Sequence, residues 1–391
     1  MQIFLIWIVI RIINSLFAIV ASPLRRLTDL ERSISIWPPS TPIQAWLNRL
    51  FLAPFERWDA KWYIKIVSQG YVHLDGAAQF HPLYPATAAI FHQFGISPLA
   101  SLMLVSTIAS LILFFAFHQL ARLDLSKEDT VFALLLLAVS PPSFVFFAPY
   151  PEGLFLIWTV ACFYWSRQQK WWLASLAGAL AVLTRQQGLF LIFPLVWEFW
   201  EARQRNLRTC LADWKNWLSF SMIPLAMFGW ISYRALYLND LQPKIANLNA
   251  FIYSVIISPK ANQVVPDQVF LPPWQTLWLA SEKLFTAPDA DLITNLVGSL
   301  LFVAIFILVW PAIRPSYRIY SLVIILVSFS YYTGNTHPTM GLLRHLMLAI
   351  PVFIGIPSLF HKPGHRLAFI TASAAGMIFL LILYVFEAWV V

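Results

Sequence analysis

Long apolar stretches separated by short polar connections dominate this sequence. They cover residues 3–21, 99–121, 130–149, 151–166, 171–184, 188–200, 217–237, 292–313, 318–333, 342–360 and 367–389. With 59% hydrophobic and 11% charged residues, a soluble domain of this length would expose more apolar surface than water tolerates. Several stretches are shorter than the roughly 20 residues of a perpendicular crossing, so they must tilt or break. We therefore predict an all-α polytopic membrane protein with about 11 transmembrane helices, within a range of about 9 to 13.

The chain is predicted to form a single transmembrane domain over residues 1–391. The first apolar stretch has no positive segment before it and is interrupted by Arg11, so we interpret it as a retained span and not as a signal peptide. Cys162 lies in an apolar stretch and Cys210 in a basic polar connection. Because these positions imply different depths, no disulfide between them is expected. Neither an internal repeat nor a separable soluble domain is visible.

Basic residues concentrate in alternate short connections, which fixes the predicted orientation. With a cytoplasmic N-terminus, the cytoplasmic connections carry most of the arginine and lysine, as the positive-inside rule requires. The long segments 22–98 and 238–291 then lie on the exoplasmic face, and such ordered loops often carry function. The net charge of +8 is explained by membrane lipids, without nucleic acid. We expect a multi-pass protein of a bacterial or archaeal cytoplasmic membrane or of the endoplasmic reticulum membrane.

The segment FERWDAKWYIKIVSQGY, residues 55–71, carries an isolated acid in the first of these loops. On a helix, Arg57, Lys61 and Lys65 form one stripe and Asp59 points to nearly the opposite side. One interpretation is an interfacial helix, with its basic residues on lipid phosphates and Asp59 in water. The other is a general base that faces a cavity between the spans and acts on a lipid-tethered substrate.

Other polar residues stand where predicted spans reach the same face. A single arginine there is commonly snorkelling, and a single histidine is commonly hydrated. Several at one depth indicate a polar cavity, because ionisable groups in a membrane are costly elsewhere. These residues are His81 and Tyr84 in FHPLYP, Glu152 in PYPEGLF, Arg185, Gln186 and Gln187 in LTRQQG, and His337, Arg344 and His345 in GNTHPTMGLLRH.

The order of these motifs resembles the GT-C fold of membrane glycosyltransferases, and more narrowly the PIG-V type, the GPI mannosyltransferase that adds the second mannose. The shared features are WD in the first long loop, FHPLYP, PYPEGLF, an arginine in a short break, and Arg344 ahead of an Ala-Ile-Pro turn. The resemblance implies inverting transfer of mannose from a polyprenyl phosphate donor, such as dolichyl phosphate mannose, to a lipid-linked glycan on the exoplasmic or lumenal face. It also implies that Asp59 is the catalytic base. Pro151 stands where family members carry a serine, and the chain is shorter than the eukaryotic enzymes, which suggests a bacterial or archaeal relative with another acceptor.

The chemistry of such a donor assigns roles to the remaining residues. The leaving phosphate carries negative charge, so cations must face it while a base acts on the opposite side of the sugar. Arg185 and Arg344, with His345, are the expected phosphate ligands, since arginine suits bidentate phosphate contact. Arg57 and Lys61 are expected to hold lipid phosphates. The expected substrate contacts are Trp58, Trp62, His81, Tyr84, Glu152, Gln186 and His337.

Two alternatives concern the class of protein and the use of a metal. Asp289-Ala-Asp291 has the DxD spacing of metal-binding nucleotide-sugar transferases, but no α/β domain surrounds it, and a helix start explains the acids equally well. The helix-start interpretation is preferred, so no metal site is predicted. GxxxxGK[ST] and GxGxxG phosphate loops are absent, so use of ATP or NAD is not expected and no cofactor is predicted. A transporter or lipid-linked sugar flippase would also have many spans, but would show pseudo-symmetric halves and few long loops.

Overall fold

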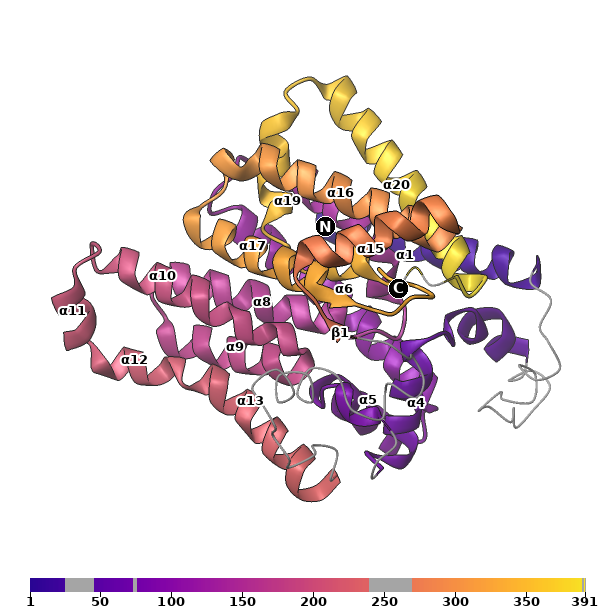
Figure 1. The fold of residues 1–391 in the computed structure, drawn as a ribbon, viewed down its shortest axis with the longest axis horizontal. Coiled ribbons are helices and arrows are strands. Elements are labelled where there is room, and N and C mark those ends of the chain that lie inside the picture. The colour runs from indigo at the N-terminus through magenta and orange to yellow at the C-terminus, as the bar shows by residue number, and fades with distance from the viewer. Residues whose placement is uncertain (25–45, 73–75, 239–268, 389, 391) are drawn as a thin grey trace.

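Helices form almost all of the regular structure of this chain (Figure 1). The computed structural model describes residues 1–24, 46–72, 76–238, 269–388 and 390. Within these ranges the strands are β1 (Val269–Phe270) and β2 (Tyr331–Tyr332), which pair antiparallel. The predicted all-α class is therefore confirmed. Prolines 243, 259 and 266 of the second long loop lie outside the described residues.

The observed helices follow the apolar stretches of the sequence. The longer ones are α1 (Gln2–Ala21), α4 (Asp59–Gln69), α5 (Leu83–Gln93), α6 (Pro98–Ala121), α7 (Lys127–Val139), α8 (Glu152–Arg167), α9 (Trp171–Thr184), α10 (Ile192–Ala202), α13 (Met222–Tyr233), α15 (Pro273–Thr286), α16 (Ala290–Val309), α17 (Pro315–Ser330) and α20 (Pro363–Val385). The shorter ones include η5 (Pro141–Phe147), η6 (Gln186–Leu191), α11 (Leu207–Ala212), α12 (Trp214–Phe220), α18 (Leu342–Leu346) and α19 (Val352–Gly355).

Two stretches that the sequence presents as continuous are broken. The stretch 130–149 bends by 79° between α7 and η5, because consecutive prolines at 141 and 142 cannot continue an α-helix. The stretch 342–360 divides into α18, α19 and a final 3₁₀ turn, with Pro351 between the first two. The chain changes direction at both breaks. The second break follows α18, the short helix that carries Arg344.

Four of the described helices are long and apolar enough to cross a membrane. They are Gln2–Leu24, Pro98–Ala121, Ala290–Ala312 and Pro363–Val385, and the bent pair of α7 and η5 would make a fifth. The apolar helices α9 and α17 are shorter. The chain is thus a multi-pass membrane protein, and the total of about 11 spans remains a prediction.

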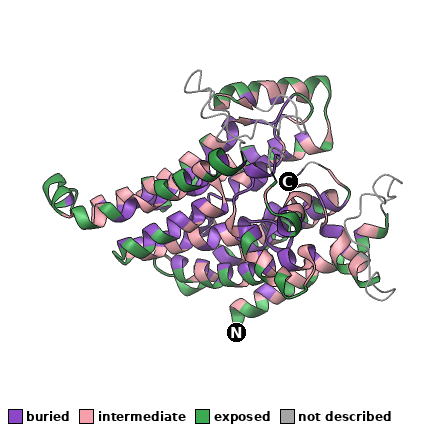
Figure 2. Cartoon of the chain, turned by 90° about the horizontal axis from the view of Figure 1, so that it is seen from below, coloured by how far each residue is buried: buried purple, intermediate pink, exposed green. Residues whose placement is uncertain are grey.

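Buried residues run through the interior of the helical body (purple in Figure 2), and α6, α8 and α9 each contribute many of them. Because lipid tails are as apolar as these side chains, close packing and buried hydrogen bonds stabilise such a bundle more than exclusion of water does. Gly153 of α8 shows the packing, since a methyl group added there would lie 3.6 Å from Ala109 of α6. Ser110, the next residue of α6, accepts a 2.9 Å hydrogen bond from Trp7 Nε1 of α1. A methyl group at Gly153 would thus only reach ordinary van der Waals contact with α6, so α8 and α6 pack at a normal distance there.

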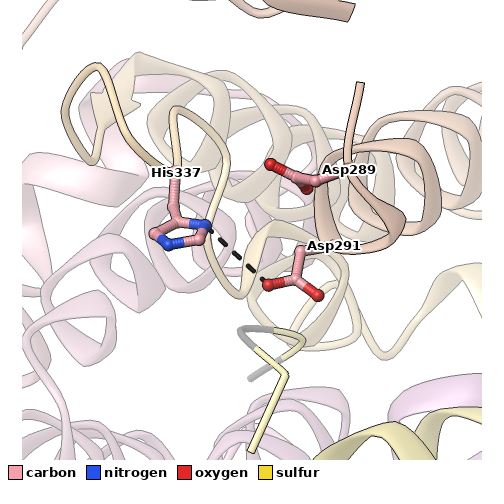
Figure 3. Close-up of side chains that lie close together, drawn as sticks. All are labelled: Asp289, Asp291 and His337. Carbon is pink, nitrogen blue, oxygen red and sulfur yellow. Dashed lines mark ion pairs between the residues drawn. The ribbon is translucent and has the colours of Figure 1, made fainter. Parts of the chain in front are cut away.

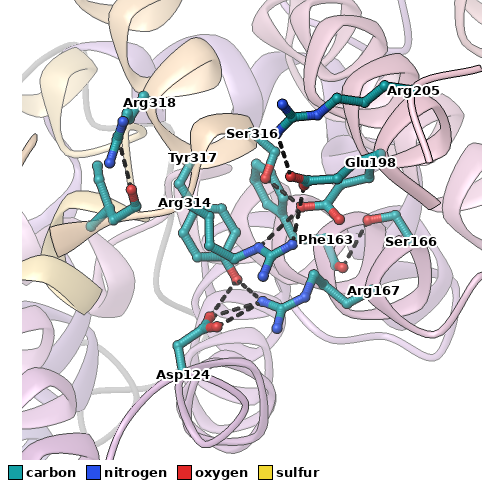
Figure 4. Close-up of polar contacts among 12 residues, drawn as sticks. Asp124, Phe163, Ser166, Arg167, Glu198, Arg205, Arg314, Ser316, Tyr317 and Arg318 are labelled. Carbon is teal, nitrogen blue, oxygen red and sulfur yellow. Dashed lines mark hydrogen bonds and ion pairs between the residues drawn. The ribbon is translucent and has the colours of Figure 1, made fainter. Parts of the chain in front are cut away.

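Ion pairs join the helix ends at the predicted cytoplasmic side (Figure 4). Arg167 at the end of α8 lies 2.9 Å from Asp124, and the Tyr317 hydroxyl donates to the same carboxylate at 3.1 Å. Arg314 lies 3.4 Å from Glu198. The expectation that these basic residues simply face lipid head groups is wrong for both arginines, because acids from other helices neutralise them.

This cluster and the predicted site lie at opposite ends of α8. Glu152 is its first residue and Arg167 its last. At 1.5 Å per residue, the two are about 22 Å apart along the helix axis. The segments that carry the predicted site residues therefore meet at the other end of the bundle.

Candidate active site

Asp59 begins α4, directly after a residue with unusual backbone geometry. Trp58 has φ +47° and ψ −120°, a combination that side chains with a Cβ rarely adopt and that costs roughly 1–3 kcal/mol. The turn is closed by hydrogen bonds from Ala60 N to Arg57 O (2.9 Å) and from Lys61 N to Trp58 O (3.0 Å). The Trp-Asp pair thus places a carboxylate at the N-terminus of α4.

Four charged residues from distant parts of the sequence form one network around this carboxylate. Arg344 Nη1 of α18 donates to Asp59 Oδ2 at 2.8 Å. Arg344 Nε lies 3.6 Å from Glu152 Oε1, and Arg185 Nη1 donates a hydrogen bond to that same oxygen. The contacts run in the order Asp59, Arg344, Glu152, Arg185, so two carboxylates alternate with two guanidinium groups. The structure thus brings together four of the residues that we predicted to lie at one depth and on one face.

Exposure divides the network into a buried part and an accessible part. The side chain of Asp59 is 33% exposed, whereas Arg344 is 8%, Arg185 12% and Glu152 0% exposed. A buried ion is tolerated when it is paired, so Glu152 is the counter-ion that allows both arginines to be buried. Asp59 is the member that a substrate can reach most easily.

The position of Arg185 depends on the break between α9 and η6. Arg185 itself has extended backbone, with φ −154° and ψ 144°, which ends α9. Its Nε donates to Gln187 Oε1 at 3.4 Å. Three residues after Arg185 the chain passes so close to α9 that a Cβ at Gly188 would lie 2.3 Å from Val182 N. The glycine in LTRQQG is therefore required for this turn.

Arg344 is held by a second contact that sequence reasoning missed. Its guanidinium carbon lies 5.0 Å from the centre of the Tyr150 ring, a cation–π arrangement. Tyr150 is fully buried beside α8. The signal was present, because Tyr150 belongs to the PYPEGLF motif, but only the folded chain brings it beneath an arginine nearly 200 residues away. Of the two glutamines in LTRQQG, Gln187 is the one that contacts Arg185, whereas Gln186 is half-buried.

Two predicted substrate contacts are engaged in the core. The Tyr84 hydroxyl hydrogen-bonds with Ser106 Oγ at 2.7 Å and donates to Leu102 O at 3.2 Å, and the residue is fully buried. His81 Nδ1 lies 2.5 Å from Val182 O. Burial lowers the pKa of His81 to about 3, with smaller lowering by Arg234 and Arg185, so the ring is neutral at physiological pH. In this structure both side chains link the first loop to the helices, in place of the open sugar contact expected from the sequence.

The remaining aromatic and imidazole groups occupy different surroundings. Trp62 stacks on Phe80 at 5.9 Å between ring centres, while Trp58 packs against the hydrophobic core. His345 stacks on Tyr331 at 6.3 Å. His337 is not among the contacts of the network; its Nδ1 lies 3.8 Å from Asp291 Oδ2. Burial lowers the pKa of His337, against the opposing effect of Asp291 and Asp289.

Arg57 does not hold a lipid phosphate as the sequence suggested. The residue is buried, at 8% exposure, and its Nη1 donates to the carbonyls of Ala53 and Glu56, each at 2.9 Å. Its Nε lies 3.4 Å from Glu387 Oε1 near the end of the chain. Arg57 therefore joins the first loop to the C-terminal segment.

Comparison with known proteins identifies the fold and no closer relationship. Neither a protein-family model nor a curated protein matches the sequence. Among solved structures, ArnT from Cupriavidus metallidurans bound to undecaprenyl phosphate matches over 98% of this chain and 76% of its own, with a TM-score of 0.51 and 12% identity. The chain has the GT-C fold.

A second similar solved structure is that of a longer protein. It is the archaeal oligosaccharyltransferase AglB from Archaeoglobus fulgidus in complex with an inhibitory peptide and a dolichol-phosphate. The match covers 98% of this chain but 56% of AglB, with a TM-score of 0.45 and 11% identity. The GT-C part of the expected resemblance is thus confirmed, while the narrower PIG-V resemblance stays a prediction.

Proposed function

We propose that this chain is an inverting glycosyltransferase that moves a sugar from a polyprenyl phosphate to a lipid-linked glycan on the exoplasmic face. The observation that carries the proposal is the partly exposed Asp59, joined to two buried arginines at one end of the bundle. The GT-C fold supports it by analogy, since ArnT of that fold was solved with undecaprenyl phosphate. Mannose as the sugar, and a GPI-precursor-like acceptor, rest on the sequence resemblance alone.

The reaction assigns one role to Asp59 and another to the two arginines. An acceptor hydroxyl gives its proton to Asp59 while its oxygen bonds to the anomeric carbon of the sugar. The bond from that carbon to the phosphate oxygen breaks, and the phosphate leaves with the electron pair. Because attack and departure occur on opposite faces, the anomeric configuration inverts. Arg344 and Arg185 would receive the phosphate charge.

The charge balance of the network suits this chemistry. Two carboxylates neutralise two guanidinium groups before the reaction. When Asp59 takes a proton, the network keeps an excess positive charge, which stabilises the departing phosphate.

Glu152 has a positioning role in this proposal. It is fully buried and contacts both arginines, so it sets their separation and does not touch the sugar. This assignment differs from the substrate contact expected from the sequence. The ring of Tyr150 packs against the Arg344 guanidinium and so also helps to hold this arginine in place.

The test is an assay with purified protein, polyprenyl-phosphate mannose and candidate lipid acceptors, with glycolipid product as the readout. Asp59→Asn keeps the size of the side chain and removes the base, so turnover should fall by about 10²- to 10⁴-fold. Glu128→Gln, at an exposed position of α7, is the matched control and should retain normal turnover. Equal turnover of the Asp59 variant, or product with retained configuration, would contradict the proposed mechanism. Movement of a labelled lipid-linked sugar across vesicles without product would favour the flippase alternative.

A further inference from the structure

A second cluster of metal-ligating side chains lies apart from the Asp59 network, where α16 begins (Figure 3). Asp289 precedes the helix, and its Oδ1 accepts a hydrogen bond from Leu292 N at 2.7 Å. Asp291 lies in the first turn, and His337 approaches from the loop between β2 and α18. One ligand atom of each residue lies within 4.8 Å of the others.

We propose that Asp289, Asp291 and His337 bind a divalent transition-metal ion, with Zn²⁺ or Mn²⁺ as the cation class. Two carboxylates and a neutral imidazole supply oxygen and nitrogen ligands, a set that favours such ions over Mg²⁺ or Ca²⁺. Ligand atoms about 2.1 Å from one ion lie within about 3.5 Å of one another, so side-chain rotation has to close roughly one ångström. All three residues are partly exposed, which leaves room for that rotation and for entry of the ion.

An adjacent buried hydroxyl independently indicates a ligand at this place. A small pocket is lined by Asp291 and His337 together with Thr339. Thr339 is 2% exposed, and its Oγ1 has no hydrogen-bond partner among the described residues. A buried hydroxyl without a partner destabilises a protein unless water or a bound group satisfies it. An ion held in the cluster would be that bound group.

A helix start alone does not account for this arrangement. It explains why Asp289 caps α16 and why a second acid favours the first turn. It requires neither a histidine from a loop 46 residues further along the chain nor a buried hydroxyl beside it. The nearby ammonium of Lys283 donates to the carbonyls of Asn335 and Thr336, which fastens α15 to the same loop.

The ion would fix the loop that leads to the active site. Residues 333–341 run from β2 into α18, which carries Arg344. Fastening His337 to the start of α16 would limit the movement of α18 relative to Asp59. This consequence rests on the proposed function, whereas ion binding itself does not. It also departs from the expectation, drawn from the sequence, that the chain uses no metal.

The experiment measures ion binding without any substrate. Metal-free protein is titrated with Zn²⁺ and, separately, with Mn²⁺, and bound metal and Tm are recorded. We expect one equivalent bound with a rise in Tm, and affinity lowered at least about tenfold in Asp291→Asn and His337→Gln. His361→Gln, at an exposed position far from the cluster, should bind as the wild type does.

The possible outcomes distinguish binding of the ion from its proposed effect on Arg344. Absence of saturable binding by folded wild-type protein, or unchanged affinity in both variants, would overturn the site. Because Asp289 also caps α16, Asp291 and His337 are the better positions for substitution, and the Tm of metal-free variants reports whether they fold. If His337→Gln loses the ion yet keeps a wild-type donor KM, the proposed link to Arg344 is wrong.

Discussion

Asp59 is the most accessible charged residue of the network, 33% exposed and 2.8 Å from Arg344. Its separation from the basic stripe of its own helix is visible in the sequence, because helical periodicity places it on another face. Its partner is not visible, since Arg344 lies 285 positions away and the 2.8 Å contact depends on how α4 and α18 pack. The same reason explains the error for Arg57, whose partner Glu387 is equally remote. Sequence patterns predict which face a residue occupies, but tertiary packing selects its partner.

Glu152→Gln tests the buried counter-ion. Glutamine keeps the shape of the side chain but leaves Arg185 and Arg344 with one carboxylate fewer inside the bundle. Removing one partner of a buried pair costs roughly 3–5 kcal/mol, so Tm should fall clearly relative to wild type. Glu128→Gln makes the same chemical change at an exposed site and should leave Tm unchanged. Equal Tm values for the two variants would contradict the proposed positioning role of Glu152.

His81→Gln tests the buried imidazole through pH. The folded pKa of about 3 lies below the ordinary value near 6.5, so the unfolded chain binds more protons between these values. Stability contributed by His81 is therefore complete above about pH 6.5 and is lost progressively as pH falls toward 3. Glutamine can still donate to the Val182 carbonyl but does not titrate. The Tm of the variant should therefore fall less between pH 6.5 and 4.5 than that of wild type, and identical pH profiles would contradict the assignment.

At the scale of elements, the apolar pattern predicted helix positions well and helix breaks poorly. The predicted stretch 171–184 coincides with α9, and 151–166 differs from α8 by one residue at each end. The missed bend after α7 was recoverable, because Pro141 and Pro142 stand inside that apolar stretch. The division of 342–360 was harder to foresee, since one proline separates α18 from α19 and most residues there remain apolar.

Gly188→Ala tests the break that positions Arg185. A Cβ at this position would lie 2.3 Å from Val182 N and 2.4 Å from Ala181 C, and backbone atoms cannot move aside as a flexible side chain can. We expect lower Tm and, under the proposed function, weaker use of the lipid-phosphate donor. Gly229→Ala is the matched control, because nothing lies within 4 Å of a Cβ added there. A wild-type Tm for Gly188→Ala would show that the turn has more room than the structure indicates.

At the scale of the whole molecule, the two polar clusters define two ends of one bundle. α8 runs from Glu152 in the candidate site to Arg167 in the ion-pair cluster, and α17 runs from that cluster back toward β2 and the loop before Arg344. The arginine- and lysine-rich connections lie at the Arg167 end, as the positive-inside rule predicts for the cytoplasm. Under this predicted orientation, a site at the opposite end would face away from the compartment that holds nucleotide sugars, which is the physical argument for the proposed lipid-linked donor.

This orientation can be tested with single cysteines and a membrane-impermeant thiol reagent in sealed, oriented vesicles. Ala77, in the first loop, is unsuitable because it is 1% exposed. Gln69 at the end of α4 and Gln168 just after α8 are both exposed, and they report the two ends of the bundle. The native Cys162 and Cys210 are buried and free, so they can be replaced by alanine to lower the background.

Gln69→Cys should react from the exoplasmic side, and Gln168→Cys only after the vesicles are opened, because the reagent cannot cross the bilayer. Reaction of both cysteines after opening shows that each is accessible in the folded protein and serves as the control. If Gln69→Cys reacted only from the cytoplasmic side, Asp59 at the other end of the same eleven-residue helix would face the cytoplasm as well. The donor would then no longer need to cross the membrane on a lipid, and both the orientation and the proposed donor class would be wrong.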